Sequence, residues 1–141
     1  FIDSTDYTLD QIVTVASMVE SEAKLDEERP TIAGVIYNRL EMDMKLQIDS
    51  TVQYALSTKN EVVTETDLTV DSPYNTYQNT GLPAGPICNP GEASLVAALK
   101  PEEHNYLYYV LKERGGSEHA FAETYDDFLA AKAEYKSTFD N

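Results

Sequence analysis

The sequence predicts an α+β domain in which several helices pack on a small β-sheet and a long Pro/Gly-rich loop stays ordered. Helical and strand-like segments are mixed without the regular alternation of a doubly wound sheet, which favours this class. Apolar residues recur at helical spacing in several segments, whereas two short segments near the C-terminus have strand-like composition. With 141 residues and 42% hydrophobic content, the chain can build one domain with its own core. We therefore expect residues 1–141 to form a single domain.

The helical segments have identifiable start signals. Thr8 and Gln11 form a capping box ahead of an apolar stripe, which predicts a helix over residues 9–24. Pro30, a favourable first-turn residue, opens a second helix that ends near Glu41. The remaining helices are expected over residues 51–56, 91–99 and 125–136.

The region between and after these helices is expected to contain a hairpin and a functional loop. Residues 106–111 are the clearest strand, and residues 119–122 pair back after the Gly115-Gly116 turn. Residues 61–70 alternate weakly and are compatible with strand, short helix or loop. Residues 72–90 hold four of the six prolines, but the interleaved tyrosine and leucine indicate an ordered loop rather than a linker. A loop of this length in a compact domain is usually functional.

Charge and composition exclude several classes of protein. The chain has 25 acidic and 10 basic residues, a formal net charge of -15, which excludes electrostatic binding to nucleic acid or to an anionic membrane. The sequence contains no Gly-rich phosphate loop, and His104 and His119 belong to no metal-binding motif, so we expect no cofactor and no metal. Cys88 is the single cysteine, which rules out an internal disulfide, and we expect it to be buried and inert.

Two glutamates at the end of the first predicted helix are candidate acids. Glu20 and Glu22 are two positions apart, so at about 100° per residue they point roughly 160° apart and at most one faces a given cleft. Desolvation by apolar neighbours raises the pKa of a carboxyl, as a general acid near neutral pH requires. The alternative is that both are solvated at the helix edge, because acidic residues are mostly exposed.

Polar side chains beside tyrosines predict a sugar-binding surface. Amide and hydroxyl groups next to flat aromatic faces suit sugar recognition. Ordinary turn formation explains the same residue types equally well. His119 is a further candidate, although with Phe121 it is also explained by strand packing. The candidates in residues 47–51 and 72–77 are Gln47, Asp49, Thr51, Tyr74, Asn75 and Tyr77.

Several short stretches occur in a characteristic order from about Leu9 to Tyr135. They are ASMVESEA at 16–23, Glu28-Arg29, IAGVIYNRL at 32–40, Leu46-Gln47 with Asp49, Thr51-Val52, SPYNTY at 72–77, GLP at 81–83, GPI at 85–87, NPG at 89–91, YLY at 106–108, and His119 with Phe121. In this order and spacing the chain resembles the YceG-like family of endolytic murein transglycosylases. The departures from the family's usual residues bear on loop stiffness and subsite detail, and they are Ile48, Ser50, Ala84 and Cys88.

The resemblance implies an enzyme that cuts inside the glycan strands of peptidoglycan. The cleaved bond would join N-acetylmuramic acid to N-acetylglucosamine, and the product would end in a 1,6-anhydro ring. The family's catalytic glutamate lies in the segment that reads VESE here; we assign it to Glu22, which precedes the small residue Ala23, with Glu20 as the fallback. The resemblance also implies a parent protein held at the cell membrane, with this domain outside the cytoplasm. Because the chain begins at Phe1 without an apolar leader, we expect a soluble excised domain whose anchor is absent from this chain.

Two other functions fit the same residues. A muramidase-like hydrolase would use Asp49 as a second carboxylate, and its products would differ by one added water. A non-catalytic glycan-binding or scaffold module of a cell-wall synthesis complex has no reason to place a glutamate at that helix edge, which disfavours it. The expected partners are glycan strands and cell-wall synthesis proteins, because recruitment would offset the repulsion between an acidic chain and an anionic polymer.

Overall fold

The computed structural model describes residues 7–57 and 63–140, and its elements follow the predicted order. They are α1 (Leu9–Glu22), η2 (Asp26–Glu28), α2 (Arg29–Glu41), α3 (Asp49–Leu56), η3 (Asp67–Thr69), α4 (Glu92–Leu99), β1 (Tyr108–Leu111), β2 (His119–Ala122), α5 (Tyr125–Ser137) and η4 (Thr138–Asp140). Each predicted helix and strand is present, with its ends shifted by at most two residues. The predicted α+β class is therefore confirmed.

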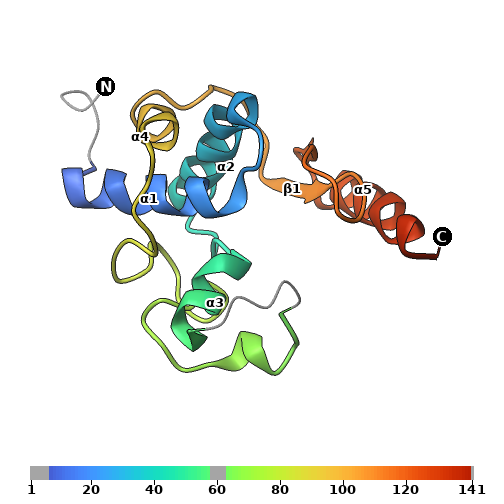
Figure 1. Ribbon diagram of the computed structural model, residues 1–141, viewed down its shortest axis with the longest axis horizontal. Helices are drawn as coiled ribbons and strands as arrows, with labels where there is room; N and C mark the ends of the chain where they lie inside the picture. The colour runs from blue at the N-terminus through green and yellow to red at the C-terminus, as the bar shows by residue number, and fades with distance from the viewer. Residues whose placement is uncertain (1–6, 58–62, 141) are drawn as a thin grey trace.

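The core lies where α1, α2 and α4 meet, the blue, teal and gold helices of Figure 1. The predicted capping box opens α1: the Thr8 hydroxyl accepts from the Gln11 backbone N–H at 3.2 Å, and the Thr8 N–H donates to the Gln11 side chain at 2.8 Å. The helix ends because Ala23 is extended. The middle of α1 is buried on all sides, from Thr14 to Val19, so its last turn is held firmly at the edge of the core. The main buried apolar side chains of the two longer helices are Ile12, Val15, Met18, Val19, Ile32 and Ile36.

Helix α2 approaches the segment that leads into β1 closely at Gly34. A Cβ on this residue would lie 2.5 Å from the carbonyl oxygen of Glu102 and 2.5 Å from Nε2 of His104. The Asn38 amide donates to the carbonyl oxygens of His104 and Tyr106 at 2.8 and 3.0 Å. These contacts fasten residues 102–106 along α2 and thereby determine where the hairpin begins.

Strands β1 and β2 form a two-stranded antiparallel sheet in which Tyr109 pairs with Phe121 and Leu111 with His119. Successive side chains of a strand face opposite sides. Tyr109 accordingly reaches the end of α1, whereas Tyr108 stacks on Phe128 of α5 with 5.2 Å between ring centroids. In Figure 1 this hairpin and α5 stand to one side of the helical core.

Residues 72–90 form an ordered loop that packs against α1, as predicted. The Ile87 backbone N–H donates to the Ser17 hydroxyl at 3.0 Å, and the Cys88 thiol donates to the Ser17 carbonyl at 3.3 Å. Cys88 is half-buried rather than buried, because it lies at the edge of this contact. In the weakly alternating stretch, residues 63–70 contain η3 and no strand, while residues 61 and 62 lie outside the described residues.

Candidate active site

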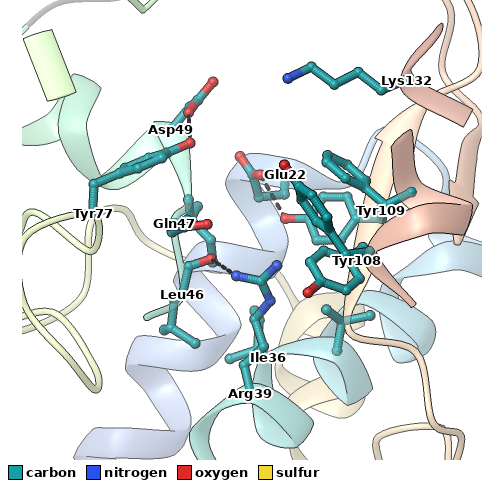
Figure 2. Close-up of a pocket in the computed structure, with 14 residues that line it drawn as sticks. Glu22, Ile36, Arg39, Leu46, Gln47, Asp49, Tyr77, Tyr108, Tyr109 and Lys132 are labelled. Atoms are coloured by element: carbon teal, nitrogen blue, oxygen red, sulfur yellow. Dashed lines mark hydrogen bonds between the residues drawn. The ribbon is translucent and has the colours of Figure 1, made fainter. Parts of the chain in front are cut away.

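A pocket of about 360 Å³ opens where the end of α1 meets the hairpin, the start of α3 and α5. Figure 2 shows its arrangement: α1 and α2 supply the floor, residues 46–49 and Tyr77 supply one wall, and the hairpin and α5 supply the other. One of the two candidate glutamates, Glu22, lies in it. The lining residues are Glu22, Val35, Ile36, Arg39, Leu46, Gln47, Ile48, Asp49, Tyr77, Tyr108, Tyr109, Tyr125, Phe128 and Lys132.

Glu22 is the last residue of α1 and points into the pocket (Figure 2). The Tyr109 hydroxyl donates a hydrogen bond to its Oε1 at 2.7 Å. Desolvation raises the pKa of the Glu22 carboxyl; the hydrogen bond from Tyr109 opposes this rise, and the negative charge of Asp49 adds to it. A carboxyl whose pKa is raised keeps its proton closer to neutral pH, which is the state a general acid requires.

The Ser50 hydroxyl lies beside the same carboxyl. Ser50 is the second residue of α3 and is 8% exposed. Among the described residues, its Oγ is the one buried side-chain nitrogen or oxygen without a hydrogen bond of normal geometry. The hydroxyl is nevertheless close enough to lower the pKa of Glu22, so it favours the charged carboxylate. The Ser50 hydroxyl can therefore donate a hydrogen bond to the candidate acid when Glu22 is charged.

Tyr109 packs against the histidine of a buried histidine–glutamate pair. His119 Nδ1 lies 2.8 Å from Glu28 Oε1, and the His119 backbone N–H donates to Glu28 Oε2 at 2.8 Å. The His119 ring meets the Tyr109 ring edge-on, with 5.3 Å between centroids. Burial and the adjacent Glu22 raise the pKa of Tyr109, so its phenol remains a hydrogen-bond donor. His119 thus contacts the pocket indirectly, through Tyr109.

Glu20 lies on the opposite side of α1, at the start of α4. Its Oε1 accepts from the Gly91 backbone N–H at 2.8 Å and from the Ser94 hydroxyl at 3.0 Å, and its Oε2 lies 3.9 Å from Nη1 of Arg29. These partners lower the pKa of Glu20, and the Gly91 hydrogen bond contributes most. The prediction that at most one glutamate faces a given cleft is confirmed. The alternative that both are simply solvated is wrong, since both carboxyls are engaged by specific donors.

Arg39 joins the two walls of the pocket. Its guanidinium donates to the carbonyl oxygens of Leu107 at 2.6 Å, Lys45 at 2.8 Å and Leu46 at 3.2 Å. The same group lies 5.0 Å from the centroid of the Tyr108 ring. Arg39 is 8% exposed. It therefore couples the start of β1 to the turn before α3, and its Nε and Nη1 donors are occupied by the protein itself.

Three of the predicted sugar contacts lie in the first wall. Gln47 and Asp49 are exposed there, and the Tyr77 hydroxyl donates to Oδ1 of Asp49. Desolvation raises the pKa of Tyr77, and the bond to Asp49 adds to the rise. Gln47 has a φ of 52°, a left-handed conformation that is uncommon outside glycine, and its N–H donates to the Thr76 carbonyl at 3.2 Å. The hydrogen bond to Thr76 thus stabilises the turn that places Gln47 in this wall.

The other predicted sugar contacts lie outside the pocket. Thr51 and Asn75 are 0% exposed, and the Asn75 amide donates to two backbone carbonyls, those of Leu68 and Val70, at 3.0 and 2.8 Å. Tyr74 packs on the ring of Tyr54, with 4.8 Å between centroids. Direct substrate contact by the Thr51 and Asn75 side chains is therefore incompatible with this structure, because both are enclosed. They stabilise the turn and loop behind the first wall.

The second wall was not predicted from the sequence. Its residues come from the hairpin and α5, and the sequence indicates Arg39, at its base, only as part of the IAGVIYNRL stretch. Tyr109 lies within the predicted strand, yet it meets Glu22 across 87 positions of sequence. The alternation of the strand was the available signal, but it shows only that Tyr108 and Tyr109 face opposite sides.

Other features of the structure do not compete with this pocket. A larger hollow of about 740 Å³ lies between the start of α1 and residues 81–86, and neither glutamate lines it. Within residues 7–57 and 63–140, no cluster of three or more His, Cys, Asp and Glu side chains is arranged to hold a metal ion. In the same part of the chain, no helix has the length and apolar character needed to cross a bilayer.

Comparison with known proteins identifies the family. Residues 2–134 match the YceG-like family. The chain belongs to the YceG-like family. The crystal structure of a yceG-like protein from Listeria monocytogenes superposes with a TM-score of 0.86 at 42% identity, covering 92% of this chain and 42% of that chain. The fold of this YceG-like domain is therefore shared with a solved relative.

Two curated relatives are named endolytic murein transglycosylase. The protein from Bacillus subtilis is 45% identical over 128 residues, which is 91% of this chain and 35% of that protein. The protein from Streptococcus pneumoniae is 37% identical over 116 residues, which is 77% of this chain and 21% of that protein. The YceG-like chain described here thus spans about a third and about a fifth of the length of these relatives.

Proposed function

We propose that this YceG-like domain is an endolytic peptidoglycan lytic transglycosylase. Its substrate would be the bond between N-acetylmuramic acid and N-acetylglucosamine inside a glycan strand, and Glu22 would be the single acid and base. The observation that carries the proposal is Glu22 itself, a half-buried carboxyl with a raised pKa at the centre of a pocket. The names of the relatives at 45% and 37% identity support the same reaction.

One carboxyl suffices because the substrate supplies its own nucleophile. Protonated Glu22 gives its proton to the bridging oxygen as the bond between that oxygen and C1 of N-acetylmuramic acid breaks. The resulting carboxylate takes the proton of the sugar's 6-hydroxyl as O6 bonds to C1 and closes the anhydro ring. Glu22 ends the cycle protonated, and no water is consumed. Tyr109 donates to Oε1, which leaves the second oxygen of the carboxyl to carry the proton.

The first wall suits the binding of an uncharged sugar. Gln47 offers an amide and Asp49 a carboxylate that can accept hydrogen bonds from sugar hydroxyls, and both side chains line the pocket. Tyr77 orients Asp49 through its hydrogen bond. Within this proposal, Thr51, Tyr74, Asn75 and His119 act as supports of the site rather than as groups that touch the sugar.

The proposal also covers the parent protein. We place it at the cell membrane through a segment outside this chain, with the YceG-like domain outside the cytoplasm. Its partners would be peptidoglycan strands and cell-wall synthesis proteins. With a net charge of -15, the domain is repelled by an anionic wall polymer, so recruitment by such partners would raise its local concentration.

The test is mass spectrometry of glycan products from purified peptidoglycan incubated with wild type, Glu22→Gln and Glu20→Gln. We expect wild type and Glu20→Gln to release fragments with anhydro ends. Glu22→Gln should lose about 10²–10⁴-fold of the rate, the contribution typical of general acid–base catalysis. Loss in Glu20→Gln alone, with the variant folded, would contradict the assignment of the acid.

Asp49 supports a second candidate, a muramidase-like hydrolase, because it brings another carboxyl to the same pocket. Product mass separates the two reactions, since hydrolysis leaves a reducing end one water heavier than an anhydro end. Hydrated ends that disappear in Asp49→Asn would support the hydrolase. Binding of wild type to peptidoglycan without any cleavage would support the non-catalytic glycan-binding module.

A further inference from the structure

Lys132 brings an unpaired positive charge to the pocket of a strongly acidic chain. It lies on α5 and lines the same pocket as Glu22, and Figure 2 shows its amine reaching over the pocket from the α5 side, opposite Asp49. None of the ion pairs within the described residues includes it. Its Nζ lies 5.9 Å from the centroid of the Phe128 ring, one helical turn away. The ammonium is thus available to a ligand.

The second cation of the pocket, Arg39, is buried and bonded to the protein through Nε and Nη1. The Nε of Arg39 donates to the Leu107 carbonyl and its Nη1 donates to those of Lys45 and Leu46, and the residue is 8% exposed. Between these two lining cations, Lys132 alone is exposed. With 25 acidic residues against 10 basic ones, most of the chain's surface repels an anion. On the α5 side of the pocket, Lys132 gives an anion a local positive partner.

Lys132 shares that side of the pocket with three aromatic rings. The Tyr108 ring stacks on Phe128 with 5.2 Å between centroids and 27° between planes, and it lies 5.8 Å from the ring of Tyr125. Such rings offer flat apolar faces against which a sugar ring can lie. The opposite wall presents Gln47 and the carboxylate of Asp49 instead. The two walls therefore differ in charge: one attracts an anionic substituent and the other repels it.

We propose that the α5 wall, made of Tyr108, Tyr125, Phe128 and Lys132, is the subsite for the carboxylate-bearing sugar, N-acetylmuramic acid. The Asp49 wall then takes the uncharged N-acetylglucosamine, and this charge asymmetry fixes the direction in which the glycan crosses Glu22. This inference rests on the proposed function and adds to it the polarity of substrate binding. The carboxylate has two sources: the free lactyl group of a peptide-free strand, or the peptide attached to that group.

The test measures binding in the Glu22→Gln background, so that cleavage does not interfere. Three glycan fragments serve as probes: peptide-free strands with free lactyl carboxylates, the same strands converted to neutral methylamides, and strands that retain their peptides. Lys132→Met is expected to weaken binding of carboxylate-bearing strands about fivefold, the upper end for an exposed ion pair, and to leave the methylamides unchanged. The control is Lys136→Met, an exposed lysine one turn further along α5 that does not line the pocket.

The pattern of the three probes decides the outcome. Weakening confined to the free-carboxylate strands assigns the lactyl group as the ligand, and weakening confined to the peptide-bearing strands assigns the peptide. Equal weakening of all three probes, or none, overturns the inference, since a merely structural role of Lys132 would not depend on the charge of the sugar. Cleavage by wild type is measured separately: if no probe is cut while the charge dependence holds, the transglycosylase proposal fails and the subsite stands.

Discussion

Glu20 and Glu22 lie two positions apart at the end of α1, yet their identical side chains lie in different environments. Glu20 meets the start of α4, where the Gly91 N–H and the Ser94 hydroxyl both donate to its carboxylate and Arg29 lies nearby. Glu22 meets the pocket, where desolvation dominates and Tyr109 supplies a hydrogen bond. The pKa of Glu20 is lowered and that of Glu22 is raised.

This difference assigns a separate task to each carboxyl. A carboxylate held by several donors is stable as an anion and fastens two helices together. A carboxyl that is poorly solvated retains its proton and is ready to transfer it. The surroundings, and not the residue type or the helix, therefore separate a structural glutamate from a candidate acid. The following variants are designed to break or sharpen this contrast.

The largest effect on the free energy of unfolding is expected at Glu20. Glu20→Ala removes the partner of the Gly91 N–H, the Ser94 hydroxyl and Arg29, and we expect it to lower the free energy of unfolding by about 2 kcal/mol. Because the pKa of Glu20 is lowered by folding, this loss is present at neutral pH and shrinks as pH falls through the native pKa. Urea unfolding at several pH values measures it, with the exposed Glu27→Ala as control. Equal stability of the two variants would contradict the structural role.

Tyr109→Phe tests the hydrogen bond at the candidate acid. We expect the turnover rate on peptidoglycan to fall about tenfold, the equivalent of one lost hydrogen bond to a charged group. The hydrogen bond lowers the pKa of Glu22, so its removal should move the alkaline decline in rate to higher pH. Tyr54→Phe, on the exposed side of α3, is the matched control. An unchanged pH profile would show that Tyr109 does not act through Glu22.

Glu22→Gln should change stability in the direction opposite to Glu20→Ala. Folding raises the pKa of Glu22, so the stability that this group contributes is present below its unfolded pKa and is lost as pH rises through the native value. Glutamine does not titrate, and the variant should therefore be more stable than wild type at neutral pH. The difference should vanish in acid, where the carboxyl of wild type is protonated. A variant that is less stable at neutral pH would mean that the pocket favours the charged form.

Ser50→Ala should produce the smallest of these effects, a small shift of the pH–rate profile. The hydroxyl lowers the pKa of Glu22, but less than Tyr109 does. Its removal should shift the alkaline decline in rate in the same direction as Tyr109→Phe and by a smaller amount. The measurement is a pH–rate profile beside Ser117→Ala, which alters an exposed serine in the hairpin turn. A larger shift than that of Tyr109→Phe would reverse the ranking of the two donors.

Much of the fold was predictable because its signals are local. The capping box at Thr8 and Gln11, the first-turn Pro30 and the Gly115-Gly116 turn each act within a few residues, and each marks an element that the structure contains. The loop over residues 72–90 was also correctly expected to be ordered. Composition did not separate Thr51 and Asn75, which are enclosed, from side chains that face a ligand, because the polar residue types that support a turn also suit sugar recognition.

The sequence by itself determined that the two glutamates of α1 must point to opposite sides, since helical geometry sets the angle between positions two apart. Only the tertiary structure decided which of them enters the pocket. That choice depends on Gly91 and Ser94 meeting one side of α1 and on Tyr109 meeting the other, contacts that span 71, 74 and 87 positions of sequence. The same holds for Lys132, because packing of the hairpin and α5 against the core, and no local pattern, places it in the wall of the pocket that holds Glu22.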